Sequence, residues 1–167
     1  MVINIKIMTL FLPIIFMLHN IEEYVSYAQF SKYYSRFIKK EFNDSTVFLY
    51  AISLLSAIAF IIVAANYFFN NDILHYLMII MLISISINAI QHCISSLYFK
   101  TILPGTISSI TLIIPYATLL SINLYKQHYP KIEWILYITI ISFIFMYLLL
   151  FMSLYIGYWI KLKLQQQ

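Results

Sequence analysis

The chain has 167 residues, of which 63% are hydrophobic and 10% are charged, whereas soluble domains average about 45 to 50% apolar and about 25% charged residues. This composition excludes a water-soluble globule, and because each bilayer crossing takes about 20 apolar residues, it suffices for roughly five membrane-spanning helices. With 2 glycines, 1 cysteine and a net charge of +4, the chain has no glycine-rich phosphate loop, no internal disulfide and no dense basic surface for nucleic acid.

Long apolar runs interrupted by charged residues predict an all-α fold, a polytopic membrane helix bundle that forms a single integral membrane domain over residues 1–167. Asn and Asp side chains before the second and third runs predict helix caps, because their oxygens accept hydrogen bonds from first-turn amides. Pro13 and Pro115 fall inside predicted spans, where each removes a backbone donor and predicts a kink. The predicted spans are residues 3–27, 45–66, 73–99, 104–124 and 134–160.

The first span ends with a His-x-x-Glu-Glu motif formed by His19, Glu22 and Glu23. At about 100° per residue, the three side chains share one face of a helix. Carboxylates in lipid cost a few kcal/mol, so this face is expected to point toward a partner, a metal ion or water. Lys6, the apolar run and the segment 26–28 also imitate a signal peptide, but the two carboxylates beside the supposed cleavage site argue against it.

The first connection is predicted to form an amphipathic helix that lies on the membrane surface. Its aromatic and aliphatic residues recur at steps of three and four positions, with cations on the opposite arc. The apolar residues are Phe30, Tyr33, Tyr34, Phe37 and Ile38, and the cations are Lys32, Arg36, Lys39 and Lys40. Such a helix is anchored at the headgroups, where each cation gains about 1 kcal/mol near anionic lipid. The alternative is a docking site for an anionic lipid or a protein partner.

The distribution of Lys and Arg predicts the orientation, because cytoplasmic connections retain positive charge. Seven cations fall on the side of the first connection, namely Lys32, Arg36, Lys39, Lys40, Lys100, Lys161 and Lys163. Three fall on the opposite side, namely Lys6, Lys126 and Lys131. We therefore expect a multi-pass cell-membrane protein with its N-terminus outside and its C-terminus in the cytoplasm.

The third span carries a polar stripe of residues four positions apart, Ser84, Asn88, His92 and Ser96. His92 lies about seven residues from the end of its span and His19 about eight from the end of the first, and in a five-helix topology these two ends share one side of the membrane. The two imidazoles are therefore expected at matching depth. His75 and His128 are expected at the opposite side and outside this site.

Two imidazoles and two carboxylates at one level predict a site for one divalent metal ion, and zinc suits this donor set best. We expect His19, Glu23 and His92 as ligands, water in the fourth position, and Glu22 as the catalytic base. Asn88 is expected to orient His92 or a substrate carbonyl. The alternative is a hydrogen bond between His and carboxylate that only fixes helix packing, for about 1 kcal/mol or less.

The residues HNIEEY at positions 19–24, preceded by FLP at 11–13, resemble the bacterial HXXEE-motif membrane proteins. That family also tends to show an Asn-x-x-x-His pair on a later helix and a following Pro-Gly, and the resemblance covers most of the chain. Its counterparts here are Asn88, His92, Pro104 and Gly105, while Lys100 is a departure as the sole cation before the Pro-Gly turn. The resemblance implies a multi-pass membrane protein without an established activity. The expected supporting residues are Ser84, Asn88 and Ser96 of the polar stripe, together with Pro104 and Gly105, which rest on the resemblance.

A looser similarity is to intramembrane CAAX-type proteases, but Tyr27 stands where their Glu-Glu-x-x-x-Arg pattern has arginine. The leading functional hypothesis is a metal-dependent membrane hydrolase acting on a lipid or peptide bond near the cytoplasmic face. The second is a proton- or cation-coupled transporter, in which a motif carboxylate exchanges a proton with a histidine. A carrier of this size would need a second copy, which predicts a homo-oligomer. The third is a small accessory or immunity-type membrane protein whose polar cluster is structural.

Overall fold

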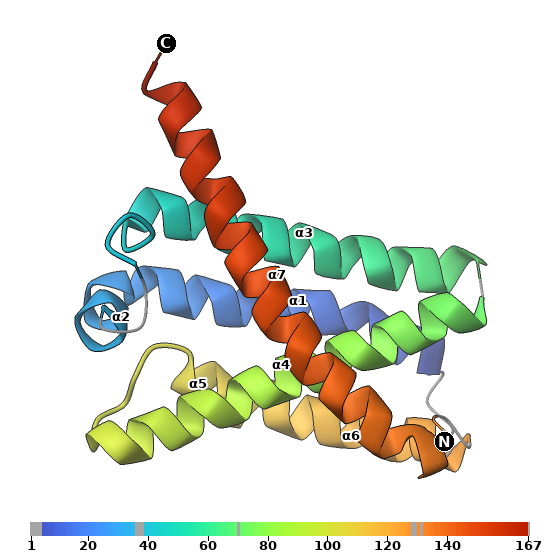
Figure 1. Cartoon of the computed structure of the whole chain (residues 1–167). Coiled ribbons are helices and arrows are strands. Elements are labelled where there is room, and N and C mark those ends of the chain that lie inside the picture. The colour runs from blue at the N-terminus through green and yellow to red at the C-terminus, as the bar shows by residue number, and fades with distance from the viewer. Residues whose placement is uncertain (1–4, 36–38, 70, 128–129, 131, 167) are drawn as a thin grey trace.

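The computed structural model describes residues 5–35, 39–69, 71–127, 130 and 132–166. Within these residues all regular structure is helical (Figure 1), as predicted. Five stretches are long and apolar enough to cross a membrane, so the chain is a multi-pass membrane protein. They are α1 (Ile5–Val25), α3 (Ser45–Phe69), α4 (Asp72–Phe99), the stretch Thr106–Lys126 and α7 (Ile135–Leu164).

The ends of these helices agree with the predicted spans to within four residues. Asp44 Oδ1 accepts hydrogen bonds from the backbone N–H groups of Thr46 and Val47, at 3.0 and 3.1 Å, and so caps α3. Asn71 Oδ1 accepts from the N–H of Ile73 at 2.8 Å and caps α4. Both predicted caps are confirmed, and each satisfies amides that a helix start leaves without an intrahelical acceptor.

The two prolines inside spans are accommodated differently. Helix α1 continues through Pro13 as one element. The stretch that contains Pro115 is divided into α5 (Thr106–Ser108), the π-helical turn η1 (Ser109–Ile113) and α6 (Ile114–Lys126). Pro115 is thus the second residue of α6, directly after a π turn, where the missing N–H does not interrupt a regular α-helical ladder.

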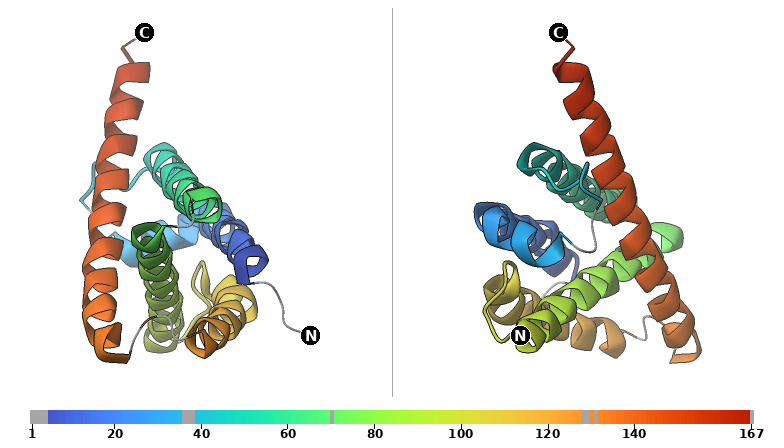
Figure 2. Two further views of the ribbon diagram at one scale, coloured as in Figure 1. Left: turned by 90° about the vertical axis from the view of Figure 1, so that its right-hand side faces the viewer. Right: turned by 60° about the vertical axis from the view of Figure 1, so that its left-hand side comes forward.

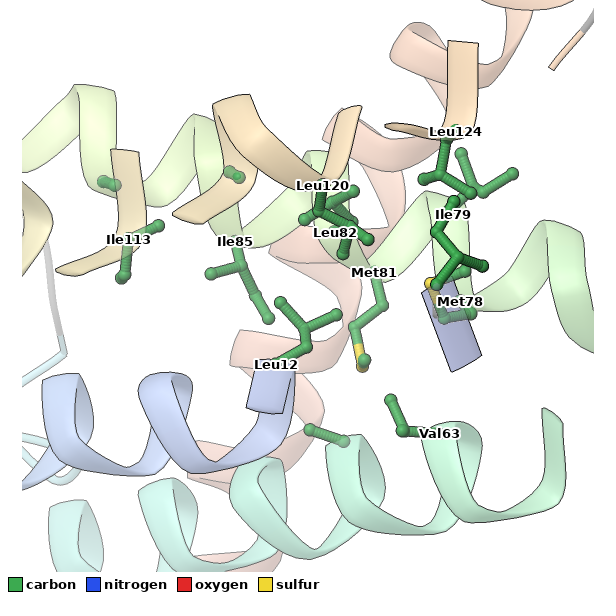
Figure 3. Close-up of a cluster of buried hydrophobic side chains, with 14 of the residues drawn as sticks. Leu12, Val63, Met78, Ile79, Met81, Leu82, Ile85, Ile113, Leu120 and Leu124 are labelled. Carbon is green, nitrogen blue, oxygen red and sulfur yellow. The ribbon is translucent and has the colours of Figure 1, made fainter. Parts of the chain in front are cut away.

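The larger hydrophobic core lies where α1, α3, α4 and α6 meet. Leu12, Val63, Met78, Leu82 and Leu120 are each at most 2% exposed and lie close together (Figure 3). A second cluster joins the first half of α3 to Leu154 of α7. Because lipid tails are as apolar as these side chains, close packing rather than water exclusion holds such helices together.

Helix α7 flanks the other four spanning helices (Figure 2) and crosses them obliquely, with its C-terminal end projecting beyond them (Figure 1). It contacts α3 closely at Gly157, where an added Cβ would lie 2.7 Å from the carbonyl oxygen of Val47. One turn further on, Lys161 Nζ lies 2.6 Å from Asp44 Oδ2. Much of the remaining surface of α7 is apolar and exposed, for example Leu136, Ile144 and Phe151, and contacts the bilayer.

The chain alternates between two ends of the bundle. The end of α1, the start of α3, the end of α4 and the end of α7 lie toward the same end (Figure 1). The short helix α2 (Tyr27–Tyr34) follows α1 there and is attached to its surroundings by two hydrogen bonds. Tyr27 Oη donates to Asn43 Oδ1 and Gln29 Nε2 donates to the carbonyl oxygen of Ile102, both at 3.0 Å.

Part of the predicted surface helix is therefore helical. Arg36, Phe37 and Ile38, which belong to the same prediction, lie outside the described residues. The placement of α2 at the membrane surface stays a prediction.

Candidate functional site

The His-x-x-Glu-Glu motif forms the last two turns of α1. Asn20, within the motif, donates from Nδ2 to Ser56 Oγ of α3 at 2.9 Å. His19 is 0% exposed and Glu23 is 7% exposed, whereas Glu22 is only partly buried. The motif face therefore points into the bundle, as the high cost of carboxylates in lipid predicts.

His92 of α4 meets this face, as predicted from the matching depth of the two histidines. Its Nε2 lies 2.7 Å from Glu23 Oε1, and His19 Nε2 lies 3.7 Å from the same oxygen. The two imidazole rings meet edge to face, with centroids 5.0 Å apart. One ligand atom from each of the three side chains lies within 4.8 Å of the others. A buried group of two imidazoles and one carboxylate at this spacing can hold a metal ion.

Two further side chains fix the ring of His19. Asn88 Nδ2, which can only donate, lies 3.1 Å from His19 Nε2, and Ser108 Oγ lies 2.9 Å from His19 Nδ1. With the Asn88 amide in this orientation, Nε2 carries the lone pair, and Nδ1 carries the proton and donates it to Ser108. The lone pair of Nε2 thus faces Glu23 and His92. Asn88 is predicted to orient His92 or a substrate carbonyl. Its amide contacts His19, and a contact with a substrate stays a prediction.

The Pro-Gly turn packs against the imidazole rings of His19 and His92. Gly105 has φ +82°, and a Cβ there would lie 2.8 Å from His19 Cε1 and 3.0 Å from His92 Cε1 and Nδ1. The position therefore requires glycine for two reasons. Its backbone is left-handed, and the imidazole rings occupy the space that a Cβ would need. Next to this turn, His92 Nδ1 is buried without a hydrogen-bond partner among the described residues.

Glu22 contacts this turn rather than the open side of the cluster. Its Oε1 accepts from the N–H groups of Gly105 and Ile107 at 3.0 and 3.2 Å, and its Oε2 accepts from the N–H of Ser108 at 2.7 Å. These amides begin the fourth spanning stretch, and an anion at the start of a helix is stabilised by the exposed N–H groups. Glu22 therefore fastens the turn that carries Gly105 onto α1.

The other supporting residues divide between this turn and a helix contact. Ser96 Oγ lies 2.6 Å from Thr106 Oγ1 and accepts from the N–H of Leu103 at 3.0 Å. Pro104 is buried beside them. Ser84 donates to the carbonyl oxygen of Ser142 at 2.9 Å and so joins α4 to α7, away from the three candidate ligands.

Of the two remaining histidines, His75 does not join the cluster, as expected. His75 lies near the start of α4 and lines a smaller hollow with Thr9, Asn66 and Asp72 at the opposite end of the bundle. His128 lies outside the described residues.

A large cavity adjoins the site, and neither Pro104 nor Gly105 is among its lining residues. It has a volume of about 670 Å³ and lies among α1, α3, α4 and α7. Glu23, Asn88 and His92 form part of its wall, and most other lining side chains are apolar. Two of the three candidate ligands, Glu23 and His92, are therefore reachable from this cavity, whereas His19 lies behind its wall.

A comparison with protein-family models gives one match, to the family described as proteins of unknown function with an HXXEE motif, over residues 10–120. The chain belongs to this HXXEE family. Every residue of the candidate site described above, from His19 to Ser108, falls within the matched range, whereas α7 lies beyond it. Comparisons with curated proteins and with solved structures gave no match.

Proposed function

We propose that this HXXEE protein is a membrane-embedded metalloenzyme, a hydrolase of a lipid or peptide bond whose metal ion is held by His19, Glu23 and His92. The single observation that carries the proposal is the convergence of these three buried donors from two helices. Two histidines and one glutamate form a known ligand set of catalytic zinc, in which the fourth position holds water. Zinc is therefore the metal that we propose.

The distances from the two histidine nitrogens to Glu23 Oε1 fit a zinc site after a small adjustment. Ligands of a tetrahedral zinc ion at about 2.0–2.1 Å lie about 3.3 Å from one another. The 3.7 Å between His19 Nε2 and Glu23 Oε1 is close to this value, whereas the 2.7 Å between His92 Nε2 and Glu23 Oε1 must widen. Metal binding would also take the lone pair of His19 Nε2 away from Asn88, leaving the Asn88 amide for an oxygen of the substrate.

The chemistry that a bound zinc ion supplies is a water molecule whose pKa is lowered toward 7. The protein contributes the orientation of the ligands. Ser108 accepts the Nδ1 proton of His19 and holds its tautomer, as is usual for histidines that bind metals. Glu22 was expected to act as a base, but its carboxylate accepts three backbone N–H bonds. These contacts favour a positioning role for Glu22.

A second candidate function is proton-coupled transport. It is favoured by the hydrogen-bond distance of 2.7 Å between His92 Nε2 and Glu23 Oε1, which is shorter than the separation of two zinc ligands. Such a pair can exchange a proton across the wall of the cavity. The two functions differ in whether the protein needs a metal ion.

Metal content tests the choice. Protein purified in mild detergent, loaded with zinc and dialysed, is expected to retain about one equivalent of zinc. The substitutions His19→Gln, Glu23→Gln and His92→Gln should each abolish retention. His75→Gln is the matched control, because it changes a histidine of the same helix as His92 but lies at the other end of the bundle. Wild-type protein that retains no zinc, and whose unfolding temperature does not respond to zinc, would exclude the zinc enzyme and leave the carrier or a structural polar cluster.

A further inference from the structure

We propose that the substrate is an acyl lipid with an uncharged carboxylic ester or amide, whose single hydrocarbon chain occupies the cavity among α3, α4 and α7. The hydrolytic role of the site rests on the proposed function, but the binding of the chain does not. Hydrolysis would consume one water molecule, break the bond between the acyl carbon and the ester oxygen or amide nitrogen, and release a fatty acid with an alcohol or amine.

The cavity has a polar end and an apolar end. Its volume of about 670 Å³ falls within the range of about 300–1,000 Å³ that is typical of small-molecule sites. Its polar lining is concentrated at the level of the candidate ligands, with Asn20, Glu23, Asn88 and His92, and at the adjacent end of the bundle, with Tyr27, Asn43 and Ser95. Deeper in the membrane domain it is lined by side chains such as Leu55, Ile58, Met81, Ile85 and Phe145. An amphiphile matches this division, with its polar group at the ligands and its chain beyond them.

The part of the cavity beyond the candidate ligands matches one leaflet of a bilayer in depth. Along α4 the lining residues run from Met81 to Ser95, and the part between His92 and Met81 is about 16 Å long at about 1.5 Å per residue. One leaflet has about half of the hydrocarbon thickness of about 30 Å. His92 lies nearer than Met81 to the end of α4, so a chain that starts at His92 points toward the middle of the membrane. The hydrocarbon chain of a bound lipid would therefore point toward the middle of the membrane, as it does in the surrounding leaflet.

This depth also sets a chain length. With carbon–carbon bonds of about 1.5 Å, an extended chain advances about 1.25 Å per bond, so about 13 bonds fill 16 Å. A myristoyl chain of about 14 carbons is the expected best fit on the same geometry.

The lining distinguishes an acyl chain from a peptide. A peptide inserted along Ile58, Met81 and Phe145 would bring backbone N–H and C=O groups against apolar side chains, where unpaired groups cost several kcal/mol. Ser84 also lines this part, but its hydroxyl already donates to carbonyl oxygens of α4 and α7. A hydrocarbon chain needs no such partners.

The charge of the lining distinguishes an ester or amide from a phosphate group. Among the described residues that line the cavity there is no lysine or arginine, while Glu23 is present. Phosphate groups in proteins are usually bound by such cations or by helix N-termini. The amides at the nearby helix start are already bound to Glu22. The polar group of the lipid is therefore expected to be uncharged.

The probe for this proposal is 1-myristoylglycerol with a photoreactive diazirine at the end of its chain, added to the protein in phosphatidylcholine nanodiscs. After irradiation, peptide mapping should find labels on Met81, Met146 or Ile58. The substitution Ile58→Trp narrows the cavity and should reduce this internal labelling about tenfold or more, because the loss of burial of about two methylene groups changes affinity about tenfold. Ile61→Trp is the matched control, since Ile61 is 67% exposed on the same helix.

A competition series adds a test that needs no substitution. Unlabelled monoacylglycerols with 10, 14 and 18 carbons should compete progressively better up to 14 carbons and no better beyond. Labels confined to exposed residues such as Ile61, or internal labels that Ile58→Trp leaves unchanged, would overturn the lipid proposal even if zinc is bound. If the wild-type protein retains no zinc after loading but is still labelled inside the cavity, the proposed metalloenzyme is refuted and the proposed lipid binding stands. His19→Gln should separate the two, losing zinc while keeping the label, because His19 is a candidate ligand but is not a lining residue of the cavity.

Discussion

Replacing Gly105 with alanine tests whether the Pro-Gly turn sets the geometry of the candidate metal site. The backbone at this position is left-handed, with φ +82°, and an added Cβ meets both imidazole rings at 2.8 to 3.0 Å. A left-handed conformation costs a residue with a Cβ about 1–2 kcal/mol, and overpacking of a filled site costs about 1–3 kcal/mol. Gly105→Ala is therefore expected to destabilise the protein by about 3 kcal/mol and to displace at least one ligand.

The second glycine provides a matched control. At Gly157 an added Cβ would lie 2.7 Å from the carbonyl oxygen of Val47, so Gly157→Ala crowds the contact between α3 and α7. This overlap also costs about 1–3 kcal/mol, but it lies away from the imidazoles. Both substitutions should thus lower stability, and only Gly105→Ala should affect the metal.

The assay is thermal unfolding in detergent with and without zinc. A ligand present at about 100 times its dissociation constant stabilises the folded state by about 2.7 kcal/mol. Zinc should raise the unfolding temperature of the wild type and of Gly157→Ala but not of Gly105→Ala. The reasoning is refuted if Gly105→Ala keeps the zinc response and unfolds within about 0.5 kcal/mol of the wild type.

Three further predictions concern coupling, pH and orientation. Double substitution of His19 and His92 by glutamine should reduce zinc binding little more than either single change, whereas additive losses would indicate two independent polar patches. The hydrogen bond from Lys161 holds the pKa of Asp44 below its usual value, so this contact stabilises the protein above about pH 4, and the contribution is lost as the pH falls through the lowered pKa. Lys161→Met should reduce this acid-induced loss in a pH series of unfolding temperatures, and an unchanged series would contradict the assignment. Reporter fusions after Lys40 and at the C-terminus should both read as cytoplasmic, and an external signal from either would reverse the proposed orientation.

The spanning helices could be predicted because their signal is local. Apolar length and the side-chain caps at Asp44 and Asn71 depend only on nearby residues, and both agree with the structure. The meeting of His19, Glu23 and His92 could also be predicted, since the first and third spans start from the same side of the membrane, so that counting residues along each span gives the depth of its polar side chains.

Other contacts could not be predicted because they depend on how helices pack. The sequence does not indicate a role for Ser108, since a serine in a membrane helix usually bonds to its own backbone. The partners of Glu22 are backbone amides, which have no signature in the sequence. Helix α7 is apolar on most of its surface, so its sequence does not indicate which side packs against α3 and which lines the cavity.

The two adjacent glutamates of the motif have different tasks because a helix turns about 100° per residue. Glu23 lies four residues after His19 and so reaches the same side of α1, where it meets His92. Glu22 lies on the neighbouring side and reaches the amides of the Pro-Gly turn. Within this turn, Gly105 packs closely against both imidazole rings. One segment of α1 thus supplies two candidate ligands, His19 and Glu23, and the carboxylate of Glu22 that binds the Pro-Gly turn beside them. This division gives a physical reason for the spacing His-x-x-Glu-Glu.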